Sequence, residues 1–195
     1  NPCRASEGPR VPGSVGRPLP GVGLRIVDEQ GHLQATSAIG QVEVQGANVF
    51  AGYLGMPDKT AEAFTPDGWF RTGDVGHIDE HGYVHLSGRA KDLIITGGFN
   101  VYPVEVEAII DKQPGVIESA VIGVPHPDFG EGVVAVIVAA PGQPLHESAF
   151  ITKLKDAIAG FKVPKRIFTV PDLPRNAMGK VQKNLLRQSF QHTFQ

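Results

Sequence analysis

Residues 88–107 read GRAKDLIITGGFNVYPVEVE, and the periodicity of the apolar side chains changes within this stretch. In its first half, short apolar runs flank Gly97-Gly98, a pattern that is typical of a β-hairpin with a tight turn. In its second half, from Pro103 onward, apolar residues recur with a period of about 3.6, which indicates a helix that ends before Gly115. We therefore place a junction between two structural regions at residues 88 and 89.

The region before this junction reads almost entirely as β-structure. Residues 23–28 and 40–45 alternate apolar with polar side chains and are bounded by glycine, which is the pattern of half-buried strands. Residues 77–79 and 83–86 flank a short turn and predict a further hairpin. Glycine makes up 24 of the 195 residues, about 12% against a usual ~7%, and this excess favours many tight turns.

The region after the junction mixes helices with strands. Residues 119–124 and 133–138 are apolar runs that predict two strands. Two helices are expected to follow, the first ended by Gly160, with apolar faces marked by Phe150, Ile151, Leu154 and Ile158 and by Val181, Leu185, Leu186 and Phe190. The fold class that we expect is α+β, with a β-rich part over residues 1–88 followed by a small mixed α/β domain over residues 89–195.

Composition excludes several classes of protein. Cys3 is the single cysteine, so the chain has neither a disulfide framework nor a cysteine-ligated metal site, and we assign no metal ligands. No apolar run approaches the roughly 20 residues of a membrane span, and residues 1–10 lack the apolar core of a signal peptide. We expect no membrane partner and a cytoplasmic location, with an organelle matrix as the alternative.

The balance of charge differs between the two regions. Residues 1–88 contain six Lys and Arg against ten Asp and Glu, whereas residues 89–195 contain twelve against ten. This asymmetry is too mild to indicate a nucleic-acid partner, which usually calls for a clustered basic face. The slight excess of basic residues suits a second region that approaches an anionic small ligand. Exposure to solvent nevertheless explains any single lysine of that region more simply.

The segment PRNAMGK, residues 174–180, pairs a glycine with a lysine, as many phosphate-binding loops do. It is not a P-loop, because that motif needs a glycine where Pro174 stands and a Ser or Thr where Val181 follows the lysine. Lys180 is then either a solvated charge near the start of a helix or a cation that is delivered to a ligand.

Two further segments carry candidate ligand-binding side chains. Asp74 ends GWFRTGD, residues 68–74, where the two oxygens of a carboxylate after a glycine turn suit both hydroxyls of a ribose. The alternative is an Asp that accepts hydrogen bonds from its own turn. Arg89 lies in GRAKD, residues 88–92, and places a permanently charged guanidinium group at the junction. The alternative is a structural role, because arginines that stabilise the end of a hairpin are at least as common.

Taken together, these segments resemble the carboxyl-terminal part of the adenylate-forming superfamily, which contains acyl-CoA synthetases, peptide-synthetase adenylation domains and luciferases. The segments that carry the resemblance are GYLGMPDKTAEAF (52–64), GWFRTGD (68–74), GRAKDLIITGGFNVYPVEVE (88–107) and LPRNAMGK (173–180). Within the superfamily, three segments most resemble the sequences of malonyl-CoA synthetases: RVPGSVGRPLPG (10–21), AVIGVPHPDFGEGV (120–133) and DLPRNAMGKVQKN (172–184).

The resemblance implies a two-step reaction. A carboxylate attacks the α-phosphate of MgATP to give an acyl-adenylate and pyrophosphate, and the thiol of CoA then displaces AMP. It also implies that Asp74 holds the ribose hydroxyls of ATP with Arg89 beside it, and that Lys180 stabilises negative charge in the first transition state. Because acetylation would remove that charge, a lysine acetyltransferase that acts on Lys180 is a further expected partner.

The resemblance further implies that the second region rotates between the two half-reactions about a hinge at Lys91. Gly97 and Gly98 match the stretch that lines the pantetheine tunnel for CoA in the thioester-forming state, where the missing side chains allow the backbone to approach closely. From the residues alone, a Gly-Gly hairpin turn needs no ligand, so both interpretations of these glycines stay open.

The chain matches only the later part of the family's pattern. In that pattern, the Ser/Thr/Gly-rich phosphate loop and the segments that bind adenine, magnesium and the acyl group come before residue 1. We therefore expect residues 1–88 to be the last β subdomain, a distorted β-barrel, of a large domain whose remainder is a missing partner. We expect this chain alone to be inactive, with ATP, magnesium, CoA and a small carboxylic acid as ligands of the whole enzyme.

Two functions are compatible with these observations. The first is an acid:CoA ligase for malonate, with another acyl-CoA ligase or an amino-acid-adenylating ligase as a variant. The second is a non-catalytic module that has kept the fold and binds a partner. The segments PRNAMGK, GWFRTGD and GRAKD are all intact, and a purely structural descendant has no physical need for all three. Their presence favours the ligase.

Overall fold

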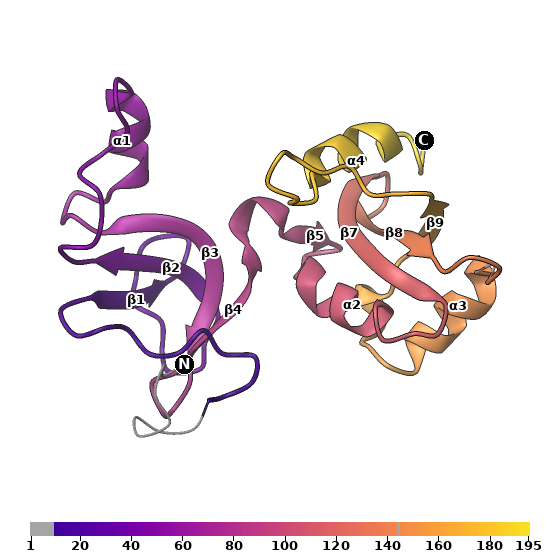
Figure 1. Cartoon of the computed structure of the whole chain (residues 1–195), viewed down its shortest axis with the longest axis horizontal. Coiled ribbons are helices and arrows are strands. Elements are labelled where there is room, and N and C mark those ends of the chain that lie inside the picture. The colour runs from indigo at the N-terminus through magenta and orange to yellow at the C-terminus, as the bar shows by residue number, and fades with distance from the viewer. Residues whose placement is uncertain (1–9, 144) are drawn as a thin grey trace. The chain divides into compact units, whose positions relative to one another are not determined.

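The computed structural model describes residues 10–143 and 145–195, which fold into two compact units (Figure 1). The first unit ends at Lys91 and the second begins at Asp92. This division lies close to the junction that the sequence places at residues 88 and 89. Each unit has its own sheet.

The first unit is built on an antiparallel sheet of four strands in the order β1-β2-β3-β4. The strands are β1 (Gly23–Val27), β2 (Gly40–Gln45), β3 (Phe70–Ile78) and β4 (Val84–Arg89). β1 and β2 coincide with the two stretches that were predicted as half-buried strands. β3 and β4 form the predicted hairpin, and β3 begins seven residues earlier than expected because the GWFRTGD segment is itself extended.

The sheet of the first unit is open. Among the described residues, the outer strands β1 and β4 are not paired with one another, and a single bridge between Gly16 and Val84 is the only addition at β4. Closing a barrel requires hydrogen bonds between the outer strands. These residues by themselves therefore form an open sheet and not the distorted β-barrel that was expected.

A short helix, α1 (Pro57–Ala63), lies between β2 and β3 and was not expected from the sequence. None of its seven residues is buried, so it has no apolar stripe with the helical period. The signal that was available is Pro57 at the first helical position, followed by Asp58 in the first turn.

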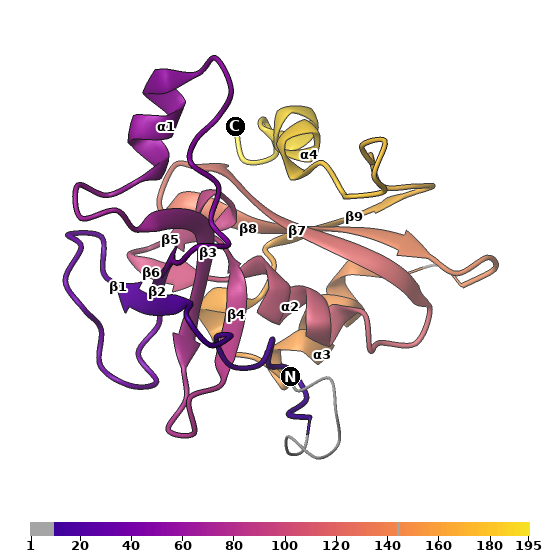
Figure 2. The same cartoon turned by 60° about the vertical axis from the view of Figure 1, so that its left-hand side comes forward.

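The second unit is a five-stranded sheet with helices on both faces. Its strands are β5 (Ile94–Thr96), β6 (Phe99–Val101), β7 (Val116–His126), β8 (Gly130–Ala139) and β9 (Arg166–Val170). Its helices are α2 (Pro103–Ile110), α3 (Glu147–Lys155) and α4 (Lys183–Phe190). β8 is central, because β7 and β5 pair with it antiparallel and β9 pairs with it in the parallel direction. Figure 2 shows α4 on one side of this sheet and α2 and α3 on the other.

Two elements of the second unit differ from the sequence-based expectation. β9 was missed, because it has only five residues and stands between Pro164 and Pro171, which weaken the strand signal. α3 ends at Lys155 and not at Gly160. Ile158 packs against the core although it lies beyond the helix, so its apolar side chain continued the helical pattern of the sequence. In the part of the chain that the structure describes, no helix has the length and apolar character needed to cross a membrane.

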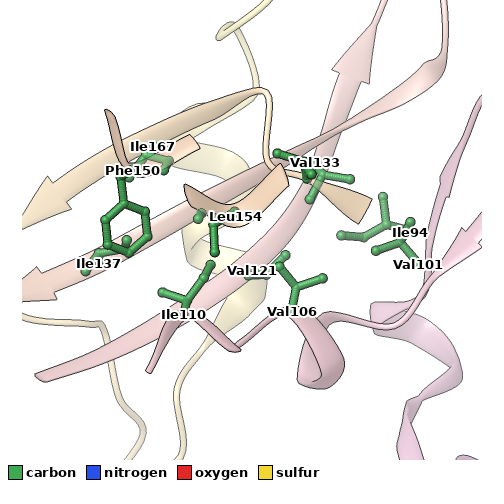
Figure 3. Close-up of a cluster of buried hydrophobic side chains, with 12 residues drawn as sticks. Ile94, Val101, Val106, Ile110, Val121, Val133, Ile137, Phe150, Leu154 and Ile167 are labelled. Atoms are coloured by element: carbon green, nitrogen blue, oxygen red, sulfur yellow. The ribbon is translucent and has the colours of Figure 1, made fainter. Parts of the chain in front are cut away.

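The core of the second unit consists of two apolar layers that are separated by the sheet. Alternate residues of β8 face opposite layers, with Val133, Ala135 and Ile137 on the α2 and α3 side and Val134, Val136 and Val138 on the α4 side. Figure 3 shows the first layer, where Leu154 of α3 and Ile110 of α2 meet Val121 of β7. A strand that is apolar at every position is typical of a strand buried on both faces.

Candidate functional site

Asp74 and Arg89 lie opposite one another on the β3–β4 hairpin, where they are cross-strand partners. Arg89 Nε and Asp74 Oδ1 form an ion pair at 2.9 Å, and the side chains of Arg89 and Asp74 are 50% and 26% exposed. No described residue donates to Asp74 Oδ2, so this carboxylate keeps acceptor capacity for the hydroxyls of a ligand.

A hydroxyl and a glycine fix the turn that carries Asp74. Thr72 Oγ1 donates to Val42 O at 2.8 Å and accepts from Asp74 N at 3.0 Å. Thr72 O accepts from Arg89 Nη1 at 3.0 Å. Gly73 has a φ of 73°, in the left-handed region where other residues are strained. The backbone of the hairpin therefore holds both charged side chains, and Thr72 is a member of the site that sequence reasoning missed.

Lys180 ends a tight turn that begins at Asn176. Asn176 N donates to Lys180 O at 2.9 Å, and Gln182 N donates to Pro174 O at 2.7 Å, so the two arms of the turn pair with one another. Gly179, with a φ of 78°, supplies the left-handed conformation that closes the turn. The Lys180 side chain is exposed and has no acidic partner among the described residues, which leaves its ammonium available to a ligand.

Two neighbouring side chains brace this turn. Asn176 Oδ1 accepts from two backbone amides of the turn, at 3.0 Å each. Arg175 Nη1 donates to Gly179 O at 2.7 Å, and its Nη2 binds Glu118 of β7. Arg175 and Asn176 lie within PRNAMGK, and neither was assigned a role from the sequence. The signal for Asn176 was available, because Asn commonly bonds the backbone of its own turn.

Lys91 is the middle residue of a 3₁₀ turn, Ala90–Asp92, and the last residue of the first unit. Its neighbour Asp92 belongs to the second unit and accepts a hydrogen bond from Arg187 of α4 at 2.8 Å. The residue that was assigned to a hinge therefore stands where one compact unit ends, and the next residue is anchored in the other.

Gly97 and Gly98 form the turn between β5 and β6, with φ values of 56° and 81°. Positive φ at both central positions is the requirement of a type I′ hairpin turn, which explains both glycines without a ligand. Gly97 N also donates to Phe129 O at 2.9 Å. A Cβ atom on Gly98 would meet nothing within 4 Å, so this side of the turn is open.

Ion pairs shape the electrostatics of both units. The hydrogen bond to Glu118 raises the pKa of Arg175 above its usual value, so this guanidinium stays charged. In the first unit, the hydrogen bond from Arg25 lowers the pKa of the Asp67 carboxyl to about 2. Residues 10–143 and 145–195 contain no group of three or more His, Cys, Asp or Glu side chains that could hold a metal ion.

The candidate residues are divided between the units. Asp74 and Arg89 are brought together in the first unit, which Lys91 ends, and Gly97, Gly98 and Lys180 lie in the second. The first unit thus offers a carboxylate to hydroxyl groups, and the second offers an unpaired ammonium to an anion.

Residues 105–180 match the family described as the AMP-binding enzyme C-terminal domain, and Lys180 is the last matched residue. A curated relative is the 3-[(3aS,4S,7aS)-7a-methyl-1,5-dioxo-octahydro-1H-inden-4-yl]propanoyl:CoA ligase of Rhodococcus jostii. It is 46% identical over 187 residues, which are 95% of this chain and 34% of the relative. The chain therefore spans about a third of the length of this relative.

Solved structures also match nearly the whole of this chain. ATP-bound MatB from Rhodopseudomonas palustris is 55% identical and matches with a TM-score of 0.92. Apo MatB from the same organism is 56% identical and matches with a TM-score of 0.69. Each match covers 97% of this chain and 38% of MatB.

Proposed function

The chain belongs to the carboxyl-terminal region of the AMP-binding acyl-CoA ligases, and from this premise we propose that the whole protein is an ATP-dependent acid:CoA ligase. In the first step, a carboxylate oxygen of the substrate attacks the α-phosphorus of ATP, the bond to the bridging oxygen breaks, and pyrophosphate leaves. In the second step, the thiol of CoA loses its proton and attacks the acyl carbon, and AMP leaves with the former carboxylate oxygen.

The acid that we propose is malonate. Residues 10–21, 120–133 and 172–184 most resemble malonyl-CoA synthetases, and MatB, an enzyme of that kind, is 55% identical to this chain. The Rhodococcus ligase, named for a much bulkier bicyclic acid, is 46% identical over a similar stretch. We infer that this third of the enzyme carries the chemistry common to both ligases and that the remainder selects the acid.

One observation carries the proposal, namely the exposed and unpaired ammonium of Lys180 at the end of a braced turn. In the first step this ammonium stabilises the negative charge that develops between the carboxylate and the α-phosphate. Lysine suits the task because it is a compact charge on a long stem, able to reach a site that is formed mainly by other segments.

We assign Asp74 to the hydroxyls of the ATP ribose. Its free acceptor capacity supports this role, and Arg89, which is bonded to both Asp74 and Thr72 O, fixes the orientation of the carboxylate. Magnesium would accompany the phosphates of ATP, and its positive charge would neutralise the leaving pyrophosphate. We propose that the magnesium site lies mostly outside this chain.

We further propose that the second unit moves between the two steps, with Lys91 as the hinge. The division of the chain between Lys91 and Asp92 supports this. In the thioester-forming arrangement, the open side of Gly98 would let the pantetheine arm of CoA pass close to the backbone.

Acetylation of Lys180 would be a means of regulation. An acetyltransferase can reach the side chain because it is exposed. The acetylated lysine has no positive charge, so we expect the first step to stop while the second step continues.

The test of the proposal separates the two half-reactions in the full-length enzyme. Lys180→Ala should lower malonate-dependent ATP–pyrophosphate exchange by about 10²–10³, because a group that stabilises charge only in the first transition state is lost. Thioester formation from preformed malonyl-adenylate should stay near the wild-type rate. The control is Lys112→Ala, which removes another exposed lysine of the second unit and should change neither rate. Equal losses in both half-reactions, or none, would contradict the role of Lys180.

Lys91→Pro and Gly98→Leu should fail in the opposite direction. The first restricts the backbone at the hinge and the second fills the open side of the turn, so both should spare exchange and block acyl-CoA formation. Gly98→Ala is the matched control, because it has the same backbone strain at φ 81° with little added bulk. The 195-residue chain alone should show no exchange. If the full-length protein shows none with any acid, the non-catalytic module is the correct interpretation.

A further inference from the structure

The turn that carries Lys180 is not held in place by apolar packing. Residues 175–180 are all exposed, and the buried side chains that flank them in sequence are Leu173 and Leu186. Ordering an exposed turn costs conformational entropy that apolar burial does not offset here. Any fixed position of the Lys180 backbone must therefore come from polar contacts.

Asn176 supplies the first set of these contacts. Its Oδ1 accepts from Met178 N and Lys180 N, while its backbone O accepts from Gly179 N at 2.9 Å. Together with the bond from Asn176 N to Lys180 O, four hydrogen bonds join this one residue to the end of the turn. An aspartate at this position would keep the two side-chain acceptor bonds, and a leucine of similar size would lose them.

Arg175 supplies the second set and links the turn to the sheet. Its guanidinium contacts Gly179 O with one nitrogen and Glu118 with the other. Glu118 lies on β7, where its neighbours in the ladder are fixed by pairing with β8. The planar fork of arginine is needed for two simultaneous contacts, and lysine, with a single ammonium, is a poor substitute.

The chain beyond the turn is anchored independently. Lys183 Nζ binds Glu107 at 2.6 Å with both side chains largely buried, and Arg187 binds Asp92. These pairs link α4 to α2 and to Asp92, and neither involves a residue of the turn. Loss of the contacts from Asn176 or Arg175 should therefore loosen residues 175–180 and leave α4 in place.

We propose that Asn176, Arg175 and Glu118 are positioning residues for Lys180 in adenylate formation, an inference that rests on the function proposed above. None of the three touches the substrate in this role, because they act on the main chain from which the lysine stem extends. A displacement of about 1 Å can cost as much as about 10² in rate. The second half-reaction does not use Lys180, and it should not depend on these residues.

The first experiment measures, in the 195-residue chain, how firmly the side chain of Asn176 holds the turn at residues 175–180. In Asn176→Leu, the amides of Met178 and Lys180 should exchange hydrogen at least about tenfold faster than in the wild type, because their acceptor is gone. In Asn176→Asp the exchange should stay near the wild-type rate. Unchanged exchange in the Leu variant would overturn the inference, whatever reaction the whole enzyme catalyses.

The second experiment measures the two half-reactions in the full-length enzyme. Asn176→Leu, Arg175→Lys and Glu118→Gln should each lower ATP–pyrophosphate exchange by about 10- to 100-fold and leave thioester formation from preformed adenylate within about twofold. Asn176→Asp should recover most of the lost rate. The matched control is Arg166→Lys, which alters another half-exposed pair, Arg166 with Glu147, and should change neither rate.

The outcomes separate this inference from the proposed function. Equal losses in both half-reactions would show a general structural defect and overturn the positioning role. Normal exchange activity in the Asn176→Leu enzyme, combined with faster amide exchange, would overturn it as well. If Lys180→Ala itself keeps full adenylation, the proposed function fails. The amide exchange result would still show that Asn176 holds the turn of Lys180.

Discussion

The two units stabilise their sheets in different ways. Among the described residues, twenty buried apolar side chains belong to the second unit and six belong to the first. The second sheet is covered on both faces by helices, whereas α1, the α-helix in the described part of the first unit, buries none of its residues. The second unit therefore has a complete core of its own, and the first depends on other interactions.

In the first unit, charged side chains link the strands. Glu43 is 3% exposed and binds Arg25 of β1 at 2.7 Å, with Arg71 of β3 at 3.7 Å on its other side. Arg25 also covers the ring of Trp69 and binds Asp67. A buried carboxylate is tolerated only with such partners, because removing it from water is costly. The comparison indicates that Asp74 and Arg89 belong to a sheet whose strands are linked by charged side chains. The turn of Lys180, itself held by polar contacts, belongs to a unit with an apolar core.

The largest effect is expected from a change to the core of the second unit. Leu154→Ala removes a fully buried side chain and should lower the free energy of unfolding of the second unit by about 2–5 kcal/mol. Far-UV circular dichroism during urea unfolding should report the loss. Trp69, the single tryptophan, lies in the first unit, so its fluorescence transition should not move.

Leu54→Ala is the control for this experiment, since Leu54 is 100% exposed. It should change neither transition. A Trp69 transition that shifts together with the circular dichroism in Leu154→Ala would show that the two units unfold as one, and the comparison between separate cores would be wrong.

A smaller effect, confined to the first unit, is expected from Gly76→Ala. A Cβ atom at this position would lie 2.2 Å from His85 O, a backbone atom that can move only with β4. The strain should cost about 1–3 kcal/mol of the unfolding free energy and appear in the Trp69 fluorescence transition. Leu54→Ala is again the control, because Leu54 is fully exposed in the same unit. If both variants behave alike, the close approach of β3 and β4 at Gly76 does not matter for stability.

The smallest effect concerns acid sensitivity. The pKa of Asp67 is lowered from 3.8 to about 2, first by the hydrogen bond from Arg25. A carboxyl group with a lowered pKa stabilises the fold above its unfolded pKa, and this contribution is lost as the pH falls through the folded pKa. The urea midpoint of the Trp69 transition should therefore decrease between about pH 4 and pH 2.

Asp67→Asn is the test of this cause. The variant should be less stable than the wild type at pH 5, and the difference should shrink by pH 2. Asp28 and Asp79 of the first unit also have lowered pKa values, so some dependence on pH should remain in the variant. An unchanged pH profile would mean that the pair with Arg25 contributes nothing measurable.

Local periodicity in the sequence was enough to predict most of the elements. The strands at 23–27 and 40–45, the two hairpins and the helix from Pro103 were all expected, and the structure confirms them. The turn glycines were also predictable, because glycine has no Cβ atom and adopts a left-handed φ without steric strain. The family of the chain could be identified for a similar reason, since its motifs are short and continuous segments.

Tertiary structure decided the features that join distant parts of the sequence. The parallel pairing of β9 with β8, the open edge of the first sheet and the contact of Arg175 with Glu118, 57 residues away, have no local signature. Likewise, the family resemblance implied a charge-stabilising role for Lys180, and only the folded chain shows which side chains hold its turn. The physical reason is that side-chain pairing depends on which strands become neighbours, and many arrangements satisfy the same local pattern.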